Sequence, residues 1–270
     1  MSANAYRAFF GLRKEPFTAD LELDGILQTP DLLAANERLQ YAIGLGAMAL
    51  VTGEVGAGKS TALRWAAGQL HPSQYRVLWV TASAGSILEL YRQLLTELDI
   101  DTASSSRAVL TRLIRRQIVE LAATKRQQPV LIVDEASLLR LDVFAELHTI
   151  SQFDGDSKPW LPIILAGQNN LADNLLYRSA GPLASRIVAR SHLASVDRQA
   201  MEQYLNHHLK RAGLKNNPFE KAAITAVHQG SGGLFRKANN LARGALLAAA
   251  AEKSLAVSAD HVRLASSELF

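Results

Sequence analysis

Residues 47–61 read Ala47-Met-Ala-Leu-Val-Thr-Gly53-Glu54-Val55-Gly56-Ala57-Gly58-Lys59-Ser60-Thr61, an apolar run that leads into a glycine-rich turn. The turn matches the pattern GxxxxGK[ST] at Gly53, Gly58, Lys59 and Ser60, and a helical pattern over 61–70 follows it. Glycines let backbone N–H groups surround a polyphosphate, and a helix N-terminus adds a partial positive charge. An apolar strand before the turn and a helix after it distinguish a phosphate-binding loop from a glycine-rich turn that binds nothing.

The polar residues at the end of this motif predict its ligands. Lys59 is expected to reach the β and γ phosphates of ATP, and the Ser60 hydroxyl is expected to ligate Mg²⁺. The remaining members of the expected nucleotide-binding set are Gly53, Glu54, Val55, Gly56, Ala57, Gly58 and Thr61. The motif therefore predicts a site for ATP and Mg²⁺ at the carboxyl end of a strand.

Two adjacent acids follow a second apolar run. Asp134 and Glu135 end the run 129–133. Ligands of a parallel sheet gather at the carboxyl ends of its strands, so we expect both acids to lie beside the phosphates. Asp134 is then expected to hold Mg²⁺, directly or through water, and Glu135 to orient and polarise the attacking water. Four apolar residues before Asp-Glu would by themselves also fit a strand that runs into a capped helix; the phosphate-binding loop favours the catalytic interpretation.

Composition indicates an ordinary globular protein. The chain has 270 residues, of which 48% are hydrophobic and 20% charged, enough for one large domain or two modest ones. The absence of cysteine excludes disulfides and thiolate metal sites. Apolar runs are too short to cross a membrane, and the N-terminus lacks the features of a signal peptide. We therefore expect a cytoplasmic protein that does not enter a membrane.

The positive charge is unevenly distributed. Residues 1–193 carry 19 Lys+Arg and 19 Asp+Glu, whereas residues 194–270 carry 10 and 6. A local cluster also lies within 107–126, where six cations face a single acid, Glu120. These cations are Arg107, Arg112, Arg115, Arg116, Lys125 and Arg126. Such stripes fit either contacts to a phosphate backbone or a solvated helix face.

Hydrophobic periodicity predicts an α/β domain followed by helices. Besides the strand that ends at Gly53, buried strands are expected over 76–82, 129–135 and 161–168, separated by helices over 86–98, 108–123 and 138–150. This alternation predicts a parallel sheet sandwiched by helices. After residue 197 only helices are expected, over 198–212, 220–228, 235–253 and 260–269. We divide the chain into an N-terminal arm (1–30), a phosphate-binding α/β domain (31–196) and a small all-helical domain (197–270).

The arm is expected to be non-helical, because aromatic residues mix there with glycine and proline. Phe9, Phe10 and Phe17 are expected to dock on the body of the protein. A helix capped by Asp31 is expected to follow and to run to about Gly44.

Six segments together resemble a known family. They are Phe9-Phe10-Gly11-Leu12 with Pro16-Phe17, the run from Thr52 to Ser60, Ile132-Val-Asp-Glu-Ala136, Leu165-Ala-Gly-Gln168, Ser185-Arg-Ile-Val-Ala-Arg-Ser-His-Leu193 and Ser231-Gly-Gly-Leu-Phe-Arg236. The chain is similar over nearly its whole length to the AAA+ ATPases of the ExeA type, a group named for a secretion-system assembly ATPase that shares its core with helper ATPases of bacterial transposons. The resemblance implies an AAA+ fold, with the C-terminal helices as a lid domain.

The resemblance also implies further site residues. Gln168 matches the position that senses the γ phosphate or the water, at the end of a strand expected beside the phosphate-binding strand. Arg186 resembles an arginine finger supplied to a neighbour's nucleotide, with Arg190 as its rival. Arg236 matches a second sensor that couples nucleotide state to the lid. The chain departs from the family pattern in the turn Gly233-Leu-Phe-Arg236, where most members have Gly-x-Pro before the arginine.

Three functions are compared on this basis. The first is an ATPase that hydrolyses ATP at the subunit interfaces of a homo-oligomeric ring or helical filament and helps DNA transposition or a similar transaction, with duplex DNA and a transposase or other protein as partners. The alternative is an ExeA-like secretion or assembly ATPase that remodels a protein partner. A nucleotide-binding scaffold without hydrolysis is disfavoured, because both Asp134 and Glu135 are present. Secretion members continue into a membrane segment and a wall-binding domain, so a chain that ends at Phe270 is expected not to bridge a membrane.

Overall fold

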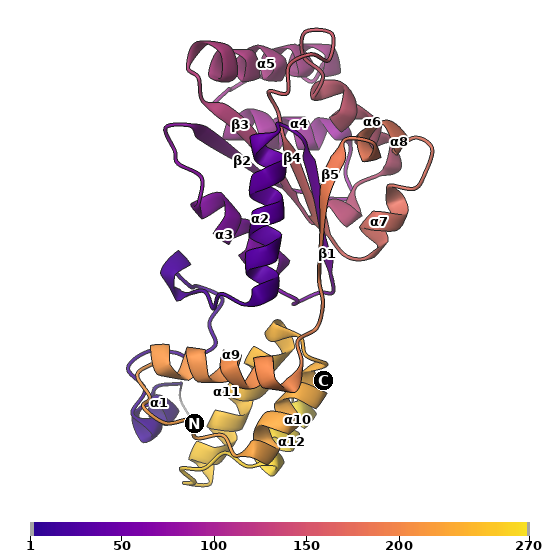
Figure 1. Ribbon diagram of the computed structural model, residues 1–270. Coiled ribbons are helices and arrows are strands. Elements are labelled where there is room, and N and C mark those ends of the chain that lie inside the picture. Colours follow the sequence, from indigo (N-terminus) through magenta and orange to yellow (C-terminus); the bar gives the residue numbers. More distant parts are fainter. Residues whose placement is uncertain (1–2, 269–270) are drawn as a thin grey trace. The chain divides into compact units, whose positions relative to one another are not determined.

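The computed structural model describes residues 3–268, which form two compact units. The sheet unit consists of Pro30–Gly53 and Lys59–Leu193. The helical unit contains the N-terminal residues up to Thr29, the turn Glu54–Gly58 and the chain from Ala194 onward. We describe each unit by itself (Figure 1).

The sheet unit is built on five parallel strands. They are β1 (Met48–Gly53), β2 (Tyr75–Thr81), β3 (Gln128–Asp134), β4 (Ile163–Gly167) and β5 (Ile187–Leu193), in the order β2-β3-β4-β1-β5. Every residue of β1 and β4 is buried, as expected for central strands covered on both faces. Exposed and buried residues alternate along β5, which is an edge strand. The predicted parallel sheet and the predicted pairing of the Gln168 strand with the phosphate-binding strand are confirmed.

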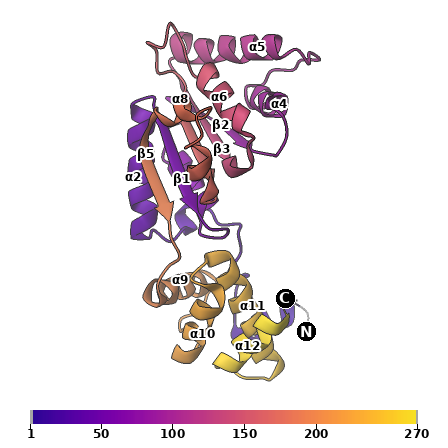
Figure 2. The same cartoon turned by 90° about the vertical axis from the view of Figure 1, so that its right-hand side faces the viewer.

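Helices cover both faces of the sheet. On one face lie α2 (Pro30–Gly44) and α3 (Lys59–Gly68), and on the other α4 (Ile87–Glu97), α5 (Arg107–Val119) and α6 (Leu141–Ile150). Figure 2 shows α2 on one side of the strands and α4 and α6 on the other. Successive strand residues serve opposite layers: Leu50 belongs to the core under α4 to α6, and the equally buried Val51 points the other way.

Local turns make two helices of this unit shorter than predicted. The expected helix over 108–123 is α5 followed by a single π-helical turn, Glu120–Thr124. The expected helix over 138–150 is a 3₁₀ turn, Ala136–Leu138, and then α6. Two further helices, α7 (Asn170–Asn174) and α8 (Gly181–Ala184), are too short to show a helical period in the sequence.

The helical unit packs four C-terminal helices. They are α9 (Arg198–Arg211), α10 (Lys221–Ser231), α11 (Phe235–Ala251) and α12 (Ala259–Glu268). Asp197 caps α9, its carboxylate accepting the Ala200 N–H at 2.7 Å. Small residues bring α11 and α12 close together, since a Cβ placed on Gly244 would lie 2.7 Å from the Ala265 Cβ.

The N-terminal arm differs from the expectation in one respect. Residues Ala3–Phe10 form a helix, α1, which ends at Gly11 in the left-handed region (φ +73°). Tyr6 and the two phenylalanines that follow lie at helical spacing, so one face of α1 packs on the core of the helical unit. The glycine and proline of this segment fall after the helix rather than within it. Docking by aromatic residues is confirmed: Phe17 is 1% exposed, and its carbonyl accepts a hydrogen bond from Arg243 at 2.8 Å.

A buried histidine lies in the core of the helical unit. The ring centroid of His208 is 4.3 Å from that of Tyr204 and 5.5 Å from that of Phe17. Burial, together with the charges of His207 and Arg211, lowers the pKa of His208 to about 4. The imidazole is therefore neutral at pH 7.

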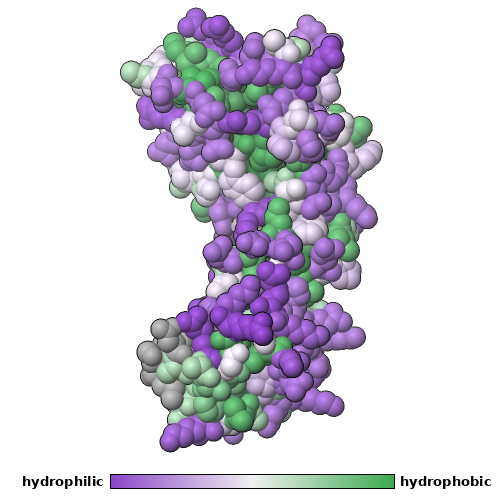
Figure 3. Space-filling view, turned by 90° about the vertical axis from the view of Figure 1, so that its left-hand side faces the viewer, coloured by the Kyte–Doolittle hydropathy of each residue, from purple (hydrophilic) through white to green (hydrophobic). Residues whose placement is uncertain are grey.

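The surface of the protein is mostly polar on the face shown in Figure 3, with hydrophobic groups scattered between the polar ones. Among residues 3–268, none of the helices has the length and apolar character that a bilayer crossing requires.

Candidate active site

The glycine-rich turn joins the end of β1 to the start of α3, as the motif predicts. Gly56 and Gly58 have φ values of +88° and +100°, which side-chain-bearing residues rarely adopt. The Ala57 N–H donates to the Glu54 carbonyl at 3.1 Å and closes the turn. Glycine at these two positions is therefore required by the backbone path itself, as well as by the approach of a phosphate.

Lys59 is held at the carboxyl end of β1. It is the first residue of α3 and is only 6% exposed. Its Nζ donates to the Gly53 carbonyl at 2.9 Å. A buried ammonium needs polar partners, and the Gly53 carbonyl is one that holds this ammonium where β1 ends.

Ser60 and Asp134 meet at the carboxyl edge of the sheet, where its strands end, although they come from different elements. The Ser60 hydroxyl donates to Asp134 Oδ2 at 2.8 Å, and Asp134 is 7% exposed. The second carboxylate oxygen accepts the Glu135 N–H at 2.9 Å. A hydroxyl and a carboxylate are hard oxygen donors, the kind that Mg²⁺ prefers, and Mg²⁺ typically keeps several waters beside one or two protein ligands. The residues present thus fit the ion that the sequence predicted.

Glu135 occupies an unusual backbone position. Its φ and ψ of 54° and 31° are left-handed, between the end of β3 and the turn Ala136–Leu138. Such conformations in a non-glycine residue cost energy and are frequent at functional sites. The side chain is half-buried, and in the part of the chain that the structure describes its carboxylate has no hydrogen bond or ion pair. Glu135 is therefore available to bind water.

Gln168 lies directly after β4, one strand from Asp134. Its N–H donates to the Ser137 hydroxyl at 3.3 Å. The preceding Gly167 allows this approach, because a Cβ there would lie 2.8 Å from the Ser137 N. The half-buried Gln168 amide is likewise unpaired among the residues described. Ser137 is a supporting residue that sequence reasoning missed; its only signal was its place two residues after Glu135.

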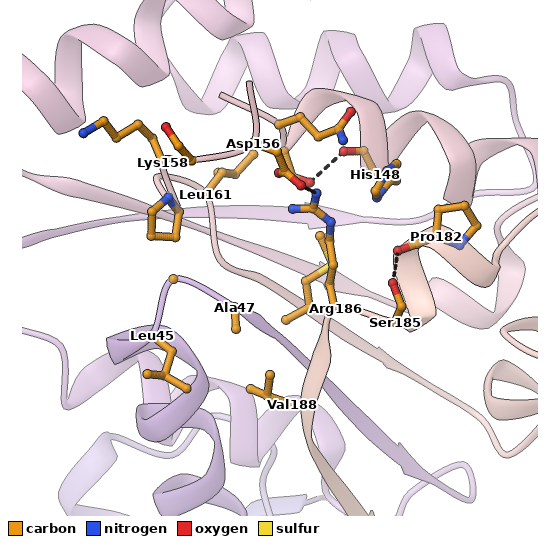
Figure 4. Close-up of a pocket in the computed structure, with 16 residues that line it drawn as sticks. Leu45, Ala47, His148, Asp156, Lys158, Leu161, Pro182, Ser185, Arg186 and Val188 are labelled. Atoms are coloured by element: carbon orange, nitrogen blue, oxygen red, sulfur yellow. Dashed lines mark hydrogen bonds and ion pairs between the residues drawn. The ribbon is translucent and has the colours of Figure 1, made fainter. Parts of the chain in front are cut away.

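Arg186 lies at the amino edge of the sheet, where its strands begin. It precedes β5, whose first residue pairs with Met48 at the start of β1, whereas the phosphate-binding turn follows the end of β1. Five residue steps along β1 correspond to about 17 Å, so Arg186 is not brought to the phosphate-binding edge of its own chain. Its guanidinium is paired with Asp156 (Figure 4). The rival Arg190 is exposed in mid-strand, aligned with Leu50.

Arg236 belongs to the helical unit. It is the second residue of α11, and its backbone N–H donates to the Gly56 carbonyl at 3.3 Å. The unusual turn before it uses two left-handed glycines, Gly232 (φ +60°) and Gly233 (φ +75°). A Cβ on Gly233 would lie 2.4 Å from the Val196 carbonyl oxygen. The Gly-Gly turn therefore retains an arginine at the start of the helix without the family's proline.

Comparison with known proteins agrees with this geometry. Residues 45–175 match the family model described as AAA domain. The chain is 31% identical over 274 residues to General secretion pathway protein A of Aeromonas hydrophila. The match covers 98% of this chain and 48% of the relative, so the chain spans about half the length of the curated relative.

Solved structures show the same fold at low identity. Cdc6p of Pyrobaculum aerophilum is similar with a TM-score of 0.75 at 16% identity, over 94% of this chain and 70% of that one. The Aeropyrum pernix ORC1 protein, solved in complex with DNA, gives 0.71 at 14% identity over 94% and 68%. The Thermotoga maritima RuvB branch migration motor gives 0.60 at 18% identity over 97% and 73%. At these identities the likeness shows the fold alone.

The family resemblance is confirmed, whereas the two expected functions are supported to different degrees. The curated relative is a secretion pathway protein, and none of the proteins reported above is named as a transposition helper. The comparisons therefore agree better with the alternative function than with the first one. The chain therefore carries an AAA domain over residues 45–175, has the AAA+ fold, and is similar to the ExeA-type ATPases that its motifs resemble.

Proposed function

We propose that the chain is a Mg²⁺-dependent ATPase that hydrolyses ATP at interfaces between copies of itself and uses the cycle to act on a protein partner. The observation that carries the proposal is the 2.8 Å hydrogen bond between Ser60 and Asp134, beside the buried Lys59. Two oxygen donors and an ammonium converge there on the edge of the sheet where the phosphate-binding turn begins.

Each residue of this edge has a role that its chemistry suits. Lys59 and the backbone N–H groups of 54–61 would bind the phosphates, and Ser60 and Asp134 would hold Mg²⁺. Bound Mg²⁺ neutralises phosphate charge and orients the polyphosphate. Glu135 would orient the attacking water and accept its proton, since its carboxylate is unengaged in the described residues. The Gln168 amide would hydrogen-bond the same water or the γ phosphate.

The position of Arg186 supports hydrolysis between subunits. The guanidinium is a planar, permanently charged fork that suits charge spread over a transferring phosphoryl group. It lies at the amino edge of the sheet, about 17 Å along β1 from its own phosphate-binding turn. We infer that it serves the nucleotide of a neighbouring copy, in a ring or a helical filament.

The protein partner is inferred from the secretion relative. This chain aligns along 98% of its length with a protein named for the general secretion pathway. A name from a secretion pathway favours the assembly alternative over a DNA transaction, which is why we place a protein partner before DNA. The inference covers only the part of the relative that this chain spans.

A Mg²⁺-ATPase assay over a range of protein concentrations tests the core of the proposal. Lys59→Ala should abolish binding of a fluorescent ATP analogue and reduce hydrolysis by about a hundredfold or more, because a preorganised cation is lost. Lys125→Ala, which alters an exposed lysine in another segment, should behave as wild type. Hydrolysis that persists in Lys59→Ala, or that does not require Mg²⁺, would overturn the assignment.

DNA remains a second candidate because α5 has a basic face. The structure reduces the charge available there: Arg107 pairs with Glu146, and Arg115 donates to the Thr149 carbonyl at 3.1 Å. Arg112 and Arg116 are exposed and have no ion pair within the described residues. Only part of the predicted stripe is thus free for phosphate contacts.

Fluorescence anisotropy with duplex DNA at low salt, with ATP and Mg²⁺, separates the two candidates. If DNA is the partner, binding should weaken steeply with salt, and replacing Arg112 and Arg116 by alanine should lower the salt slope by about 2. Arg140→Ala provides a matched control on an exposed arginine outside α5. Absence of binding at low salt would remove the DNA candidate and leave the protein partner.

A further inference from the structure

The backbone of Arg186 is fixed independently of its side chain. Its N–H donates to the Leu183 carbonyl at 3.0 Å, and its carbonyl accepts the Met48 N–H at 3.1 Å. The guanidinium, in contrast, reaches out of the sheet edge to Asp156, in a loop 30 residues earlier in the chain. The side chain can therefore change partner without any change in the strand.

The loop that carries Asp156 is closed by its own hydrogen bonds. Phe153 and Lys158 form an antiparallel bridge, and the Ser157 hydroxyl donates to the Asp154 carbonyl at 2.8 Å. Three successive residues, 154–156, have left-handed φ values of 49°, 60° and 71°. Phe153 is 2% exposed and anchors one end of the loop in the core. The loop thus holds Asp156 in place whether or not Arg186 is bound.

The ion pair borders an open pocket of about 730 Å³ at the amino edge of the sheet. Figure 4 shows the Arg186 guanidinium beside Asp156, with His148 to the right of the pair and Lys158 to its left. The hydrogen bond from Arg186 lowers the pKa of Asp156, and burial with the nearby Arg186 charge lowers the pKa of His148. At pH 7 the lining therefore carries one negative charge, on Asp156, against Arg186 and Lys158. Without that carboxylate the pocket would suit an anion.

The pair is accessible enough to exchange. The side chain of Arg186 is 25% exposed and that of Asp156 47%. Exposed ion pairs contribute little to folding, and the hydrogen bonds above already fix the strand and the loop. Carboxylate and phosphate both fit the guanidinium fork, so a phosphate that enters the pocket competes with Asp156 for the same donors.

We propose that Asp156 is a positioning residue, an inference that rests on the proposed function. In a separate subunit Asp156 holds the Arg186 guanidinium in an ion pair, and it releases the guanidinium when the phosphate of an ATP bound to a neighbouring copy competes for it. Asp156 thereby opposes premature assembly and couples engagement of Arg186 to a nucleotide on the adjoining subunit. An exposed pair of this kind should shift the assembly equilibrium by about two- to fivefold.

The test compares Asp156→Asn with Asp154→Asn in the full chain. Both positions have left-handed φ values in the same loop, and asparagine tolerates that region as aspartate does. Mg²⁺-ATPase rate per chain is measured against protein concentration, with light scattering to follow assembly. Asp156→Asn should lower the half-maximal protein concentration about two- to fivefold and leave the saturating rate unchanged, and Asp154→Asn should match wild type.

Two outcomes would overturn the inference. If Asp156→Asn matches Asp154→Asn, the carboxylate does not restrain Arg186. If it lowers the saturating rate, Asp156 instead holds Arg186 in its working position. The double variant with Arg186→Ala must equal Arg186→Ala alone, since the effect passes through that side chain.

Failure of the proposed function gives a different result. A wild-type rate per chain that does not rise with protein concentration, or an Arg186→Ala variant with full activity, would reject hydrolysis between subunits and this inference with it. A wild type and an Arg186→Ala variant that behave as proposed, beside an inert Asp156→Asn, would reject only the role of Asp156.

Discussion

The two edges of the same parallel sheet are built in opposite ways. At the carboxyl edge, Lys59 and Asp134 are almost inaccessible and are fixed by short hydrogen bonds, while the carboxylate of Glu135 has no partner among the described residues. At the amino edge, Arg186 and Asp156 form a partly exposed ion pair. At the carboxyl edge the binding groups are fixed and the Glu135 carboxylate is unengaged among the described residues. At the amino edge the Arg186 guanidinium is held by a partner that a phosphate can replace.

This difference follows from the topology. Parallel strands place all their carboxyl ends together, so one edge collects the groups that bind a ligand. The opposite edge cannot reach that ligand within one chain. An arginine at the amino edge acts on a nucleotide only if a second copy brings the two edges together, and the predictions below test that division of labour.

The largest effect is expected from Arg186→Ala. Loss of an arginine that stabilises the transferring phosphoryl group should reduce ATP hydrolysis by about 10³- to 10⁵-fold and leave nucleotide binding intact. Steady-state ATPase and analogue-binding assays measure the two. Mixing this variant with Lys59→Ala should restore part of the activity, because one subunit then supplies the arginine and the other the phosphate-binding edge. If Arg190→Ala shows the loss and Arg186→Ala does not, the rival arginine is the active one.

A smaller loss is expected from Glu135→Gln at the carboxyl edge. Glutamine keeps the shape of the side chain but cannot accept the proton of water, so hydrolysis should fall by about 10²- to 10⁴-fold. Bound ATP should persist and stabilise the oligomer, which size-exclusion chromatography with ATP detects. Glu120→Gln, on the turn after α5, is the matched control. Undiminished turnover would show that another group orients the water.

The Mg²⁺ requirement should respond to Ser60. Ser60→Ala removes one oxygen donor and the partner of Asp134, so the Mg²⁺ concentration for half-maximal activity should rise about tenfold or more. Ser73→Ala, at an exposed serine away from the edge, should leave it unchanged. An unaltered Mg²⁺ dependence in Ser60→Ala would contradict its assignment as a ligand.

The carboxyl edge was largely predictable because its signals are local. The turn that follows β1 and the acids that follow β3 each sit at the end of an apolar strand, and parallel strands put strand ends side by side. The pairing of β4 with β1 was predicted as well, and it places Gln168 on that edge. The Gly167 to Ser137 approach was not predictable, because it depends on how two loops pack.

The amino edge was not predictable in the same way. Asp156 lies 30 residues before Arg186 in a loop without a recognised motif, so no spacing rule connects them. The contacts of the basic stripe were not predictable for a related reason: Arg115 lies over the Phe153 ring at 4.6 Å, a tertiary contact that charge counting does not reveal. Helix α1 was missed because the glycine that follows it and the proline further along obscured a helical pattern of eight residues.

The smallest expected effect is an absence of pH dependence at the amino edge. The ion pair between Arg186 and Asp156 should persist from pH 6.5 to 8. The pKa of Asp156 is lowered below its ordinary value of about 3.8, and the guanidinium stays charged over this range. A carboxylate with a lowered pKa contributes above its unfolded pKa and loses the contribution only as pH falls through the folded value, far below this range. His148 stays mainly neutral there because its pKa is lowered too.

The ratio of half-maximal protein concentrations for wild type and Asp156→Asn should therefore be constant from pH 6.5 to 8. Below about pH 6.5 the neutral, buried His208 lowers the free energy of unfolding. Its pKa of about 4 is lower than in the unfolded chain, so unfolding takes up a proton and the protein becomes less stable as the pH falls toward 4. Measurements above pH 6.5 avoid that loss. A ratio that approaches one at the acid end of the range would mean that His148 protonates beside Arg186 and weakens the ion pair, and the amino edge would then respond to pH as well as to assembly.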